Sequence, residues 1–347
     1  MISKDQIKRI YLDTNQWIKF GQISNGKESD PEYKKIFIAI KELTKHDKIR
    51  VLFSAFTLNE IWKYHKVKQQ DELIDLILDI SKLWVLKPYN FFKEKEIENA
   101  ASFVLESKYI HDIHSEILGR GVGDIFGVSF EYIVQNSPRI EHLIKNNHRG
   151  LSYDFFKKDF QKFNEDMEII KKNLKSLQAR KLSQKISDES KKHLDNMEEY
   201  RFKNSKMNKD LFSRYSQARA LVDGAIPHLV VFMHSNKITA DQLFSPNGKE
   251  KMELFNKHLN SMNVLSILVL ERDFSSEKQI ISNDAYDMAH LSGAIPYCDV
   301  IVTEKMFAHI SRKKKLDVIY DCDILDDLRL LSQIEPIKSK IQDLENS

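Results

Sequence analysis

The stretch RIYLDTNQWIKF, residues 9–20, carries the first evidence on the fold and on a possible site. A short apolar run near an amino terminus is typical of a buried strand, and this run ends abruptly on Asp13, followed by Thr14 and Asn15. A charged side chain at the end of a buried strand needs water, a helix cap or a ligand. The apolar run before Asp13 would bury its backbone, and short polar groups follow it, so we favour a ligand.

The composition is that of a globular protein of one or two domains, since the 347 residues are 41% hydrophobic. There are 54 Lys and Arg against 51 Asp and Glu, so a basic surface must come from local clusters. Cys298 and Cys322 lack a metal-like spacing, which argues for a reducing compartment and against structural zinc. No apolar run approaches the roughly 20 residues that span a bilayer. We therefore expect a cytoplasmic protein that does not enter the membrane.

Strand-like and helix-like segments alternate at the start of the chain. The expected strands cover residues 10–13, 50–54 and 82–88, and the expected helices cover 34–43 and a long segment from 57 onward. This βαβαβ order predicts a parallel sheet.

A polar segment with helical patterns interrupts this order before it returns near the carboxyl end. There we expect a helix at 282–294, a strand and turn at 298–305, a helix at 306–314 and a last strand at 316–321. The sequence therefore predicts an α/β domain with a central parallel sheet, formed by residues 1–90 and 261–347 and split by a helical insertion at 91–260.

Acidic residues stand where these elements meet the carboxyl edge of the expected sheet. Asp13 and Glu304 each follow a strand, and Glu60, Asp284 and Asp287 fall in the first turns of two helices. Ligand sites of parallel sheets lie at this edge. Clustered carboxylates repel one another unless a cation neutralises them, and oxygen ligands select Mg²⁺ or Mn²⁺. Such a site suits phosphodiester hydrolysis.

Most of these carboxylates also have a purely structural interpretation. Residues 57–60, TLNE, form a capping box in which Glu60 returns a hydrogen bond to the helix start. Asp284 would favour the helix dipole, and Asp287 could pair with His290 one turn later. Asp299 is expected to begin a strand at the edge away from the site.

Three stretches resemble the PIN-domain nucleases. They are IYLDTNQWI at 10–18, FSAFTLNEIWK at 53–63 and NDAYDMAHLSGAIPYCDVIVTEKMF at 283–307. They are similar in order and residue type to the family's opening strand, its Glu-bearing helix, and its Asp-bearing helix with the strand after it. The resemblance implies a Rossmann-like sheet and an endonuclease that cleaves RNA.

The resemblance also implies roles for individual residues. Mg²⁺ or Mn²⁺ would be bound by Asp13, Glu60, Asp287 and Glu304, and Thr303 and Asn15 would support the metal's water or its ligands. Two departures stand out. Glu304 replaces the family's usual Asp, and the insertion at 91–260 exceeds the minimal domain. We expect substrate choice to lie in the insertion, which is also the candidate surface for a protein partner or a second copy.

Three other functions are compatible with the motifs. A haloacid-dehalogenase-like phosphatase also begins with a strand ending in Asp, and Asp326 and Asp327 could mimic its late acidic pair. Its Asp-x-Asp motif would place Asn15 at the second position, however, where an amide cannot protonate a leaving group. A DNA-cleaving nuclease would use the same metal chemistry. An inactive nuclease scaffold would bind nucleic acid without cleaving it.

Two basic clusters are candidate RNA-binding surfaces. Lys171, Lys172, Lys175 and Lys181 fall in one predicted helix, and Arg312, Lys313, Lys314 and Lys315 lie near the expected metal edge. Solvated helices often carry such charges. Their combination with an acidic metal site favours nucleic-acid binding.

Overall fold

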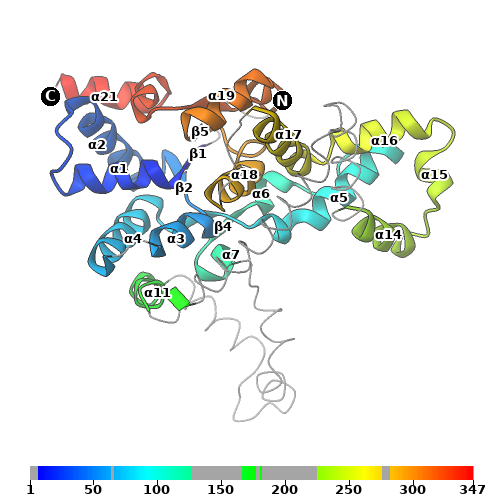
Figure 1. Cartoon of the computed structure of the whole chain (residues 1–347), viewed down its shortest axis with the longest axis horizontal. Helices are drawn as coiled ribbons and strands as arrows, with labels where there is room; N and C mark the ends of the chain where they lie inside the picture. Colours follow the sequence, from blue (N-terminus) through cyan, green and yellow to red (C-terminus); the bar gives the residue numbers. More distant parts are fainter. Residues whose placement is uncertain are drawn as a thin grey trace, which may run out of the picture. The chain divides into compact units, whose positions relative to one another are not determined.

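The computed structural model describes residues 7–63, 66–126, 166–176, 180–181, 225–275 and 282–346 (Figure 1). The architecture is mixed α/β, with one four-stranded sheet in the order β2-β1-β5-β6. The chain divides into two compact units. The first comprises Met1–Pro88, Leu118–Lys185 and Asp327–Ser347, and the second comprises Tyr89–Ile117 and Ile186–Asp326. The division into 1–90, 91–260 and 261–347 stays a prediction, because much of the middle segment lies outside the described residues.

The strands pair in parallel within each unit. Their bounds are Lys8–Leu12 for β1, Ile49–Leu52 for β2, Val300–Val302 for β5 and Asp323–Leu325 for β6. β1 pairs with β2 and β5 pairs with β6, both in parallel. All three residues of β5 and the last four of β1 are buried, and apart from Arg9 these residues are apolar or aromatic, as expected for strands covered on both faces. The predicted parallel sheet is confirmed at this level.

Helices of the first unit pack around an aromatic core. They are α1 (Thr14–Ser24), α2 (Pro31–Lys45), α3 (Ala55–Trp62), α4 (Val67–Ser81), α7 (Val122–Phe126), α11 (Met167–Leu174), the 3-10 helix η3 (Leu328–Gln333) and α21 (Ile337–Glu345). Phe20 of α1 meets Trp17 and Phe37 edge-on, at ring-centre distances of 6.1 and 5.3 Å. α2 lies beside α21 (Figure 1), and Lys35 pairs with Glu345 at 2.6 Å.

The expected third strand forms, but it does not join the four-stranded sheet. β3 (Trp84–Leu86) pairs antiparallel with β4 (Leu118–Arg120) in a separate two-stranded sheet. One parallel bridge, between Phe53 and Val85, is its link to the end of β2. After α4, Lys82 and Leu83 adopt left-handed backbone angles, φ 51° and 68°, which redirect the chain before β3 begins.

Two further elements were predicted wrongly. The long helix expected from residue 57 is two helices, α3 and α4. The apolar run at 316–321, expected as the last strand, is the helix α20 (Leu316–Tyr320), and the last strand is β6. Leu316 of this run is buried, whereas Val318 and Ile319 are 74% and 57% exposed. The run is therefore apolar without being core, which misled the prediction.

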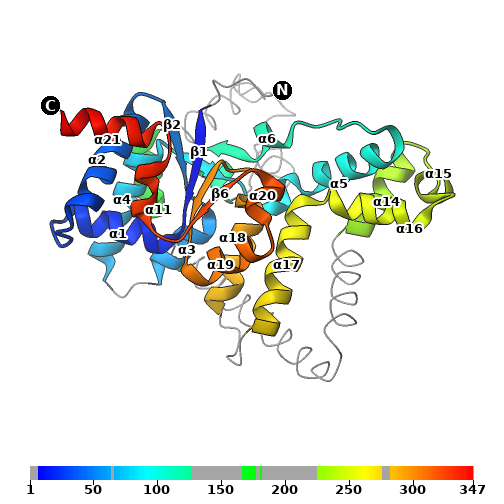
Figure 2. The ribbon, with the colours of Figure 1, turned by 90° about the horizontal axis from the view of Figure 1, so that it is seen from above.

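The second unit is mainly helical. Besides α20 it holds α5 (Tyr89–Glu106), α6 (Ile113–Glu116), α14 (Ile226–Ser235), α15 (Ala240–Phe244), α16 (Gly248–Lys257), α17 (Asn260–Ser275), α18 (Ser282–Ala294) and α19 (Lys305–Lys313). α5, α14 and α16 lie side by side (Figure 2), with Ile97, Phe232 and Phe255 in their shared core. None of the helices in the described ranges is both long and apolar enough to cross a membrane.

A buried carboxyl group links three parts of the second unit. Glu96 of α5 is 1% exposed. Its Oε1 accepts hydrogen bonds from the Tyr297 hydroxyl, just after α18, and from the backbone N of Ser261 in α17, the latter at 3.0 Å. Burial raises the pKa of Glu96, although both hydrogen bonds oppose the rise. The carboxyl group thus links α5, α17 and the segment after α18. Ionising this buried group costs free energy.

We expect Glu96→Gln to stabilise the protein at pH 7 and to have little effect at pH 4. In the folded protein the pKa of Glu96 is raised, so its contribution to stability is complete below the unfolded value of about 4.3 and is lost as the pH rises toward the folded value. The amide stays uncharged and still accepts both hydrogen bonds. The gain should be about 1.4 kcal/mol for each unit by which the folded pKa is raised.

Thermal unfolding between pH 4 and pH 8 measures this difference. Glu106→Gln, at the exposed end of the same helix, is the control and should change the melting temperature little at any pH. A Glu96→Gln effect that does not vary with pH would show that the carboxyl titrates normally in the folded protein.

Candidate metal centre

Asp13 stands where β1 ends and α1 begins. It is the N-cap of α1: its Oδ1 accepts a hydrogen bond from the backbone N of Thr14 at 2.5 Å, and its side chain is buried, with the residue 1% exposed. A helix N-terminus favours a negative charge at this position. A carboxylate has two oxygens with several lone pairs, so capping and ligand binding are compatible. Asp13 therefore caps α1, one of the roles expected from the sequence, and its carboxylate could still bind a ligand.

Glu60 is held beside the start of α1, because Thr14 Oγ1 donates a hydrogen bond to Glu60 Oε2. The predicted capping box at 57–60 was wrong. α3 begins at Ala55, its N-cap is Ser54, and the box is formed by Ser54 and Thr57. Glu60 consequently lies in the second turn of α3, where it is half-buried and bound by a neighbouring helix rather than by its own start.

Negative charge gathers around the end of β1. Tyr11 is fully buried there, and its hydroxyl lies 3.1 Å from Ser54 Oγ. Burial raises the pKa of Tyr11, and the charges of Asp13 and Glu60 raise it further, while the Ser54 hydrogen bond opposes the change. The rise in the pKa is therefore mainly an effect of burial, and the two neighbouring carboxylates add to it.

α18 carries three titratable residues one turn apart. Asp284 Oδ2 accepts hydrogen bonds from Arg272 of α17, at 2.6 Å from Nη2 and 3.1 Å from Nε, and both residues are buried. The sequence predicted that Asp284 would favour the dipole at the start of this helix. In the structure its carboxylate also pairs with the Arg272 guanidinium. The predicted pair of Asp287 and His290 is present: His290 Nε2 lies 3.1 Å from Asp287 Oδ1, and both residues are buried.

The two ends of β5 carry the remaining predicted site residues. Thr303, after the strand, is fully buried and its backbone N donates to the carbonyl of Leu325 at 3.0 Å. Glu304 follows as the exposed N-cap residue of α19. Asp299 precedes the strand at its amino end, as the sequence predicted, and its carbonyl accepts a hydrogen bond from Asp323.

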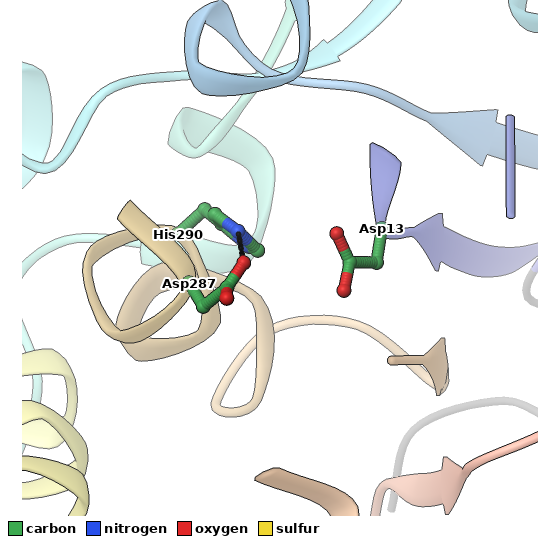
Figure 3. Close-up of side chains that lie close together, drawn as sticks. All are labelled: Asp13, Asp287 and His290. Carbon is green, nitrogen blue, oxygen red and sulfur yellow. Dashed lines mark hydrogen bonds and ion pairs between the residues drawn. The ribbon is translucent and has the colours of Figure 1, made fainter. Parts of the chain in front are cut away.

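Within the described residues, Asp13, Asp287 and His290 each offer one ligand atom, and these atoms all lie within 4.8 Å of one another. Figure 3 shows the Asp13 carboxylate facing the hydrogen-bonded pair of Asp287 and His290. Two buried carboxylates at this spacing are costly to keep ionised together without a cation. Two oxygens and an imidazole nitrogen suit Mn²⁺ and related transition metals, whereas Mg²⁺ prefers oxygen alone. The donor set therefore fits a divalent cation.

This group contains two of the four predicted ligands, Asp13 and Asp287. Glu60 is joined to the residue after Asp13, and Glu304 is outside the group. His290 was predicted only as a partner of Asp287. The spacing Asp-x-x-His, which puts both side chains on one face of a helix, is the signal that would have made it a candidate ligand. Asn15, predicted to support the site, is exposed in the first turn of α1.

The predicted basic helix at 171–185 differs from the structure. α11 ends at Leu174, and residues 177–179 and 182–185 lie outside the described part. Lys175 pairs with Asp75 at 2.6 Å and Lys171 with Glu168 at 3.3 Å, so both cations are partly neutralised. Lys172 and Lys181 are exposed. Lys175, just after α11, therefore links this helix to α4.

The second basic cluster is also largely engaged by acidic side chains. Arg312 binds Asp326 at 2.9 Å and donates to the carbonyl of Ile324 at 3.1 Å. Lys313 and Lys314 both pair with the buried carboxylate of Glu271, at 3.1 and 2.7 Å. Lys315 is exposed at the end of this run.

The acidic pair of the phosphatase alternative has structural partners as well. Asp326 is bound by Arg312, and Asp327 caps η3. Asp327 Oδ1 accepts a hydrogen bond from the backbone N of Arg329 at 2.9 Å and one from the Tyr33 hydroxyl at 3.2 Å. Neither carboxylate belongs to the group around Asp13.

We expect Asp284→Asn to destabilise the protein by about 3 kcal/mol or more, because it removes the charge that balances the buried Arg272 guanidinium. Asp287→Asn should change stability much less, since it leaves no buried guanidinium without its counter-charge. Urea unfolding of the two variants measures the difference. An Asp284→Asn protein of unchanged stability would show that the ion pair is not a structural support.

Comparison of the chain with protein-family models, curated proteins and solved structures finds no match. The resemblance to PIN-domain nucleases therefore depends on the three sequence stretches alone.

Proposed function

We propose that this protein is an endoribonuclease that hydrolyses phosphodiester bonds with a bound Mn²⁺ or Mg²⁺. The observation that carries the proposal is the buried group formed by Asp13, Asp287 and His290. A divalent cation bound there would lower the pKa of a water molecule and stabilise negative charge on the phosphate oxygens. The imidazole donor favours Mn²⁺ over Mg²⁺.

The chain's own residues would hold and orient the reacting groups. Asp13 and Asp287 would supply the charge that binds the cation, and the hydrogen bond that Asp287 Oδ1 accepts from His290 Nε2 would fix the orientation of the imidazole. Thr14 fixes one oxygen of Glu60, which would hold a water molecule beside Asp13. Glu304, exposed at the start of α19, is the candidate for contact with substrate-side water or a second cation.

RNA is the proposed substrate because the three stretches described above resemble the PIN-domain nucleases, and that resemblance implies RNA cleavage. Hydrolysis by an activated water does not use the RNA 2′-hydroxyl, so the same residues would also support DNA cleavage. Parallel assays with RNA and DNA of one sequence distinguish these substrates. An inactive scaffold would bind either nucleic acid and cleave neither.

Asp13→Asn should lower cleavage by roughly 100-fold or more while leaving the fold intact. The substitution removes a charged ligand, but asparagine caps a helix as well as aspartate does, so α1 should keep its start. Cleavage of labelled RNA and far-UV circular dichroism measure the two effects.

Asp30→Asn is the matched control. Asp30 caps α2 in the same unit, through a hydrogen bond from Glu32, and the substitution is chemically identical. Equal losses of activity in the two variants would mean that Asp13 acts through the helix cap and not through a metal.

We further expect the products to carry 5′-phosphate and 3′-hydroxyl ends, because the attacking group is water. Cleavage should stop in EDTA, return more fully with Mn²⁺ than with Mg²⁺, and require about 10- to 100-fold more Mn²⁺ in the His290→Gln variant. Product ends are read by mass spectrometry. Cyclic 2′,3′-phosphate formed in EDTA would refute metal-dependent hydrolysis.

A further inference from the structure

Two arginine side chains lie over one tryptophan in the first unit. The guanidinium carbon of Arg50, from β2, is 4.0 Å from the ring centre of Trp84, and that of Arg120 is 5.8 Å from it. Arg120 is the residue opposite Trp84 in the β3–β4 pair, so the strand register creates this contact. Stacking on an aromatic ring extends the guanidinium and leaves its N–H groups directed along its edge.

A third arginine lies beside this pair. Arg9 lies opposite Arg50 in the β1–β2 register, and like charges in this arrangement repel. Burial lowers the pKa of Arg50; Asp47 opposes this effect and Arg9 reinforces it. An arrangement of this kind is stabilised when an anion binds.

Neither Arg50 nor Arg120 forms an ion pair with a carboxylate among the described residues. In the described part of the chain, no carboxylate oxygen lies within ion-pair distance of the Arg50 or Arg120 guanidinium. Asp124 is close in sequence, but its carboxylate accepts from the backbone N of Arg120 at 2.7 Å and pairs with Lys87 at 3.4 Å. The contrast with Lys175 and Arg312, which bind acidic partners, distinguishes this surface from the basic clusters predicted from sequence.

We propose that Arg50, Arg120 and Trp84 form a binding surface for the phosphate backbone of single-stranded nucleic acid, which is the RNA substrate if the function proposed above is correct. A guanidinium matches a phosphate with two parallel hydrogen bonds, and an adjacent indole matches a nucleobase. Arg120 is exposed and Arg50 half-buried, so the surface is accessible.

The surface lies at a useful distance from the proposed metal centre. Arg9, opposite Arg50, precedes Asp13 by four residues of β1, a span of roughly 13 Å at the rise of a strand. The length of β1 thus sets the separation between the arginines and Asp13, and one RNA strand that contacts both would have to pass outside this buried strand. The arginines would supply affinity that an acidic metal centre cannot.

The experiment measures binding in the Asp13→Asn protein, so that cleavage does not interfere. Fluorescence anisotropy of a labelled single-stranded RNA, at several salt concentrations, gives the affinity and its salt dependence. The double variant Arg50→Gln, Arg120→Gln should bind at least 10-fold more weakly at low salt. Its slope of log affinity against log salt should be smaller by about 1.4, or 0.7 for each lost phosphate contact.

Arg329→Gln is the matched control. Arg329 also lies over an aromatic ring, Tyr33 at 5.4 Å, but its charge is paired with Asp327 at 2.7 Å. Its removal should leave affinity and salt slope unchanged. Circular dichroism verifies that the variants are folded. If the double variant unfolds, single substitutions at the exposed Arg120 test the proposal instead: Arg120→Gln should weaken RNA binding, and Arg120→Lys should retain most of it.

Unchanged affinity and slope in the folded arginine variants would overturn the proposal, as would an equal loss in Arg329→Gln. Displacement of the RNA by a polyglutamate peptide of equal charge at equal concentration would also overturn it, because the surface would then recognise carboxylates. Failure of the two proposals is distinguishable. RNA bound through the arginines but never cleaved contradicts the nuclease alone, whereas metal-dependent cleavage with arginine-independent binding contradicts the surface alone.

Discussion

The charge on Asp13, at the point where a buried strand ends and a helix begins, is the constraint on which the proposed site depends. A carboxylate there must be compensated, and the backbone N–H of Thr14 provides part of that compensation. The same residue, Thr14, fixes Glu60 through its hydroxyl. Backbone geometry at one strand-to-helix junction thus gathers two carboxyl groups, and any ligand that binds them is favoured by their mutual repulsion.

The pattern of the sequence was sufficient for elements whose burial and period agree. β1, β2 and α18 were predicted because their apolar residues are also the buried ones. The prediction failed at 316–321, where Val318 and Ile319 are apolar but exposed, so the run has a strand's composition without a strand's environment. It also failed at β3, whose antiparallel partner β4 comes from a segment with little strand signal.

Site residues could be predicted where their type and place in the sequence indicate a ligand. They could not be predicted where their role depends on side chains that are distant in the sequence. Asp13 and Asp287 could be chosen because each follows from the order of elements. Pairings such as Arg272 with Asp284, or Lys175 with Asp75, join residues whose proximity no local pattern encodes. For the same reason the lysine-rich stretches looked like nucleic-acid surfaces, whereas Arg50 and Arg120, isolated in the sequence, did not.

The packing of α2 against α21 has a consequence for how the protein is made. Tyr33 binds Asp327, and the two residues are 294 positions apart. A ribosome must therefore synthesise the roughly 300 residues that follow α2 before α21 can cover this helix. During that interval the face of α2 that packs on α21 stays uncovered, so this part of the first unit completes its folding late.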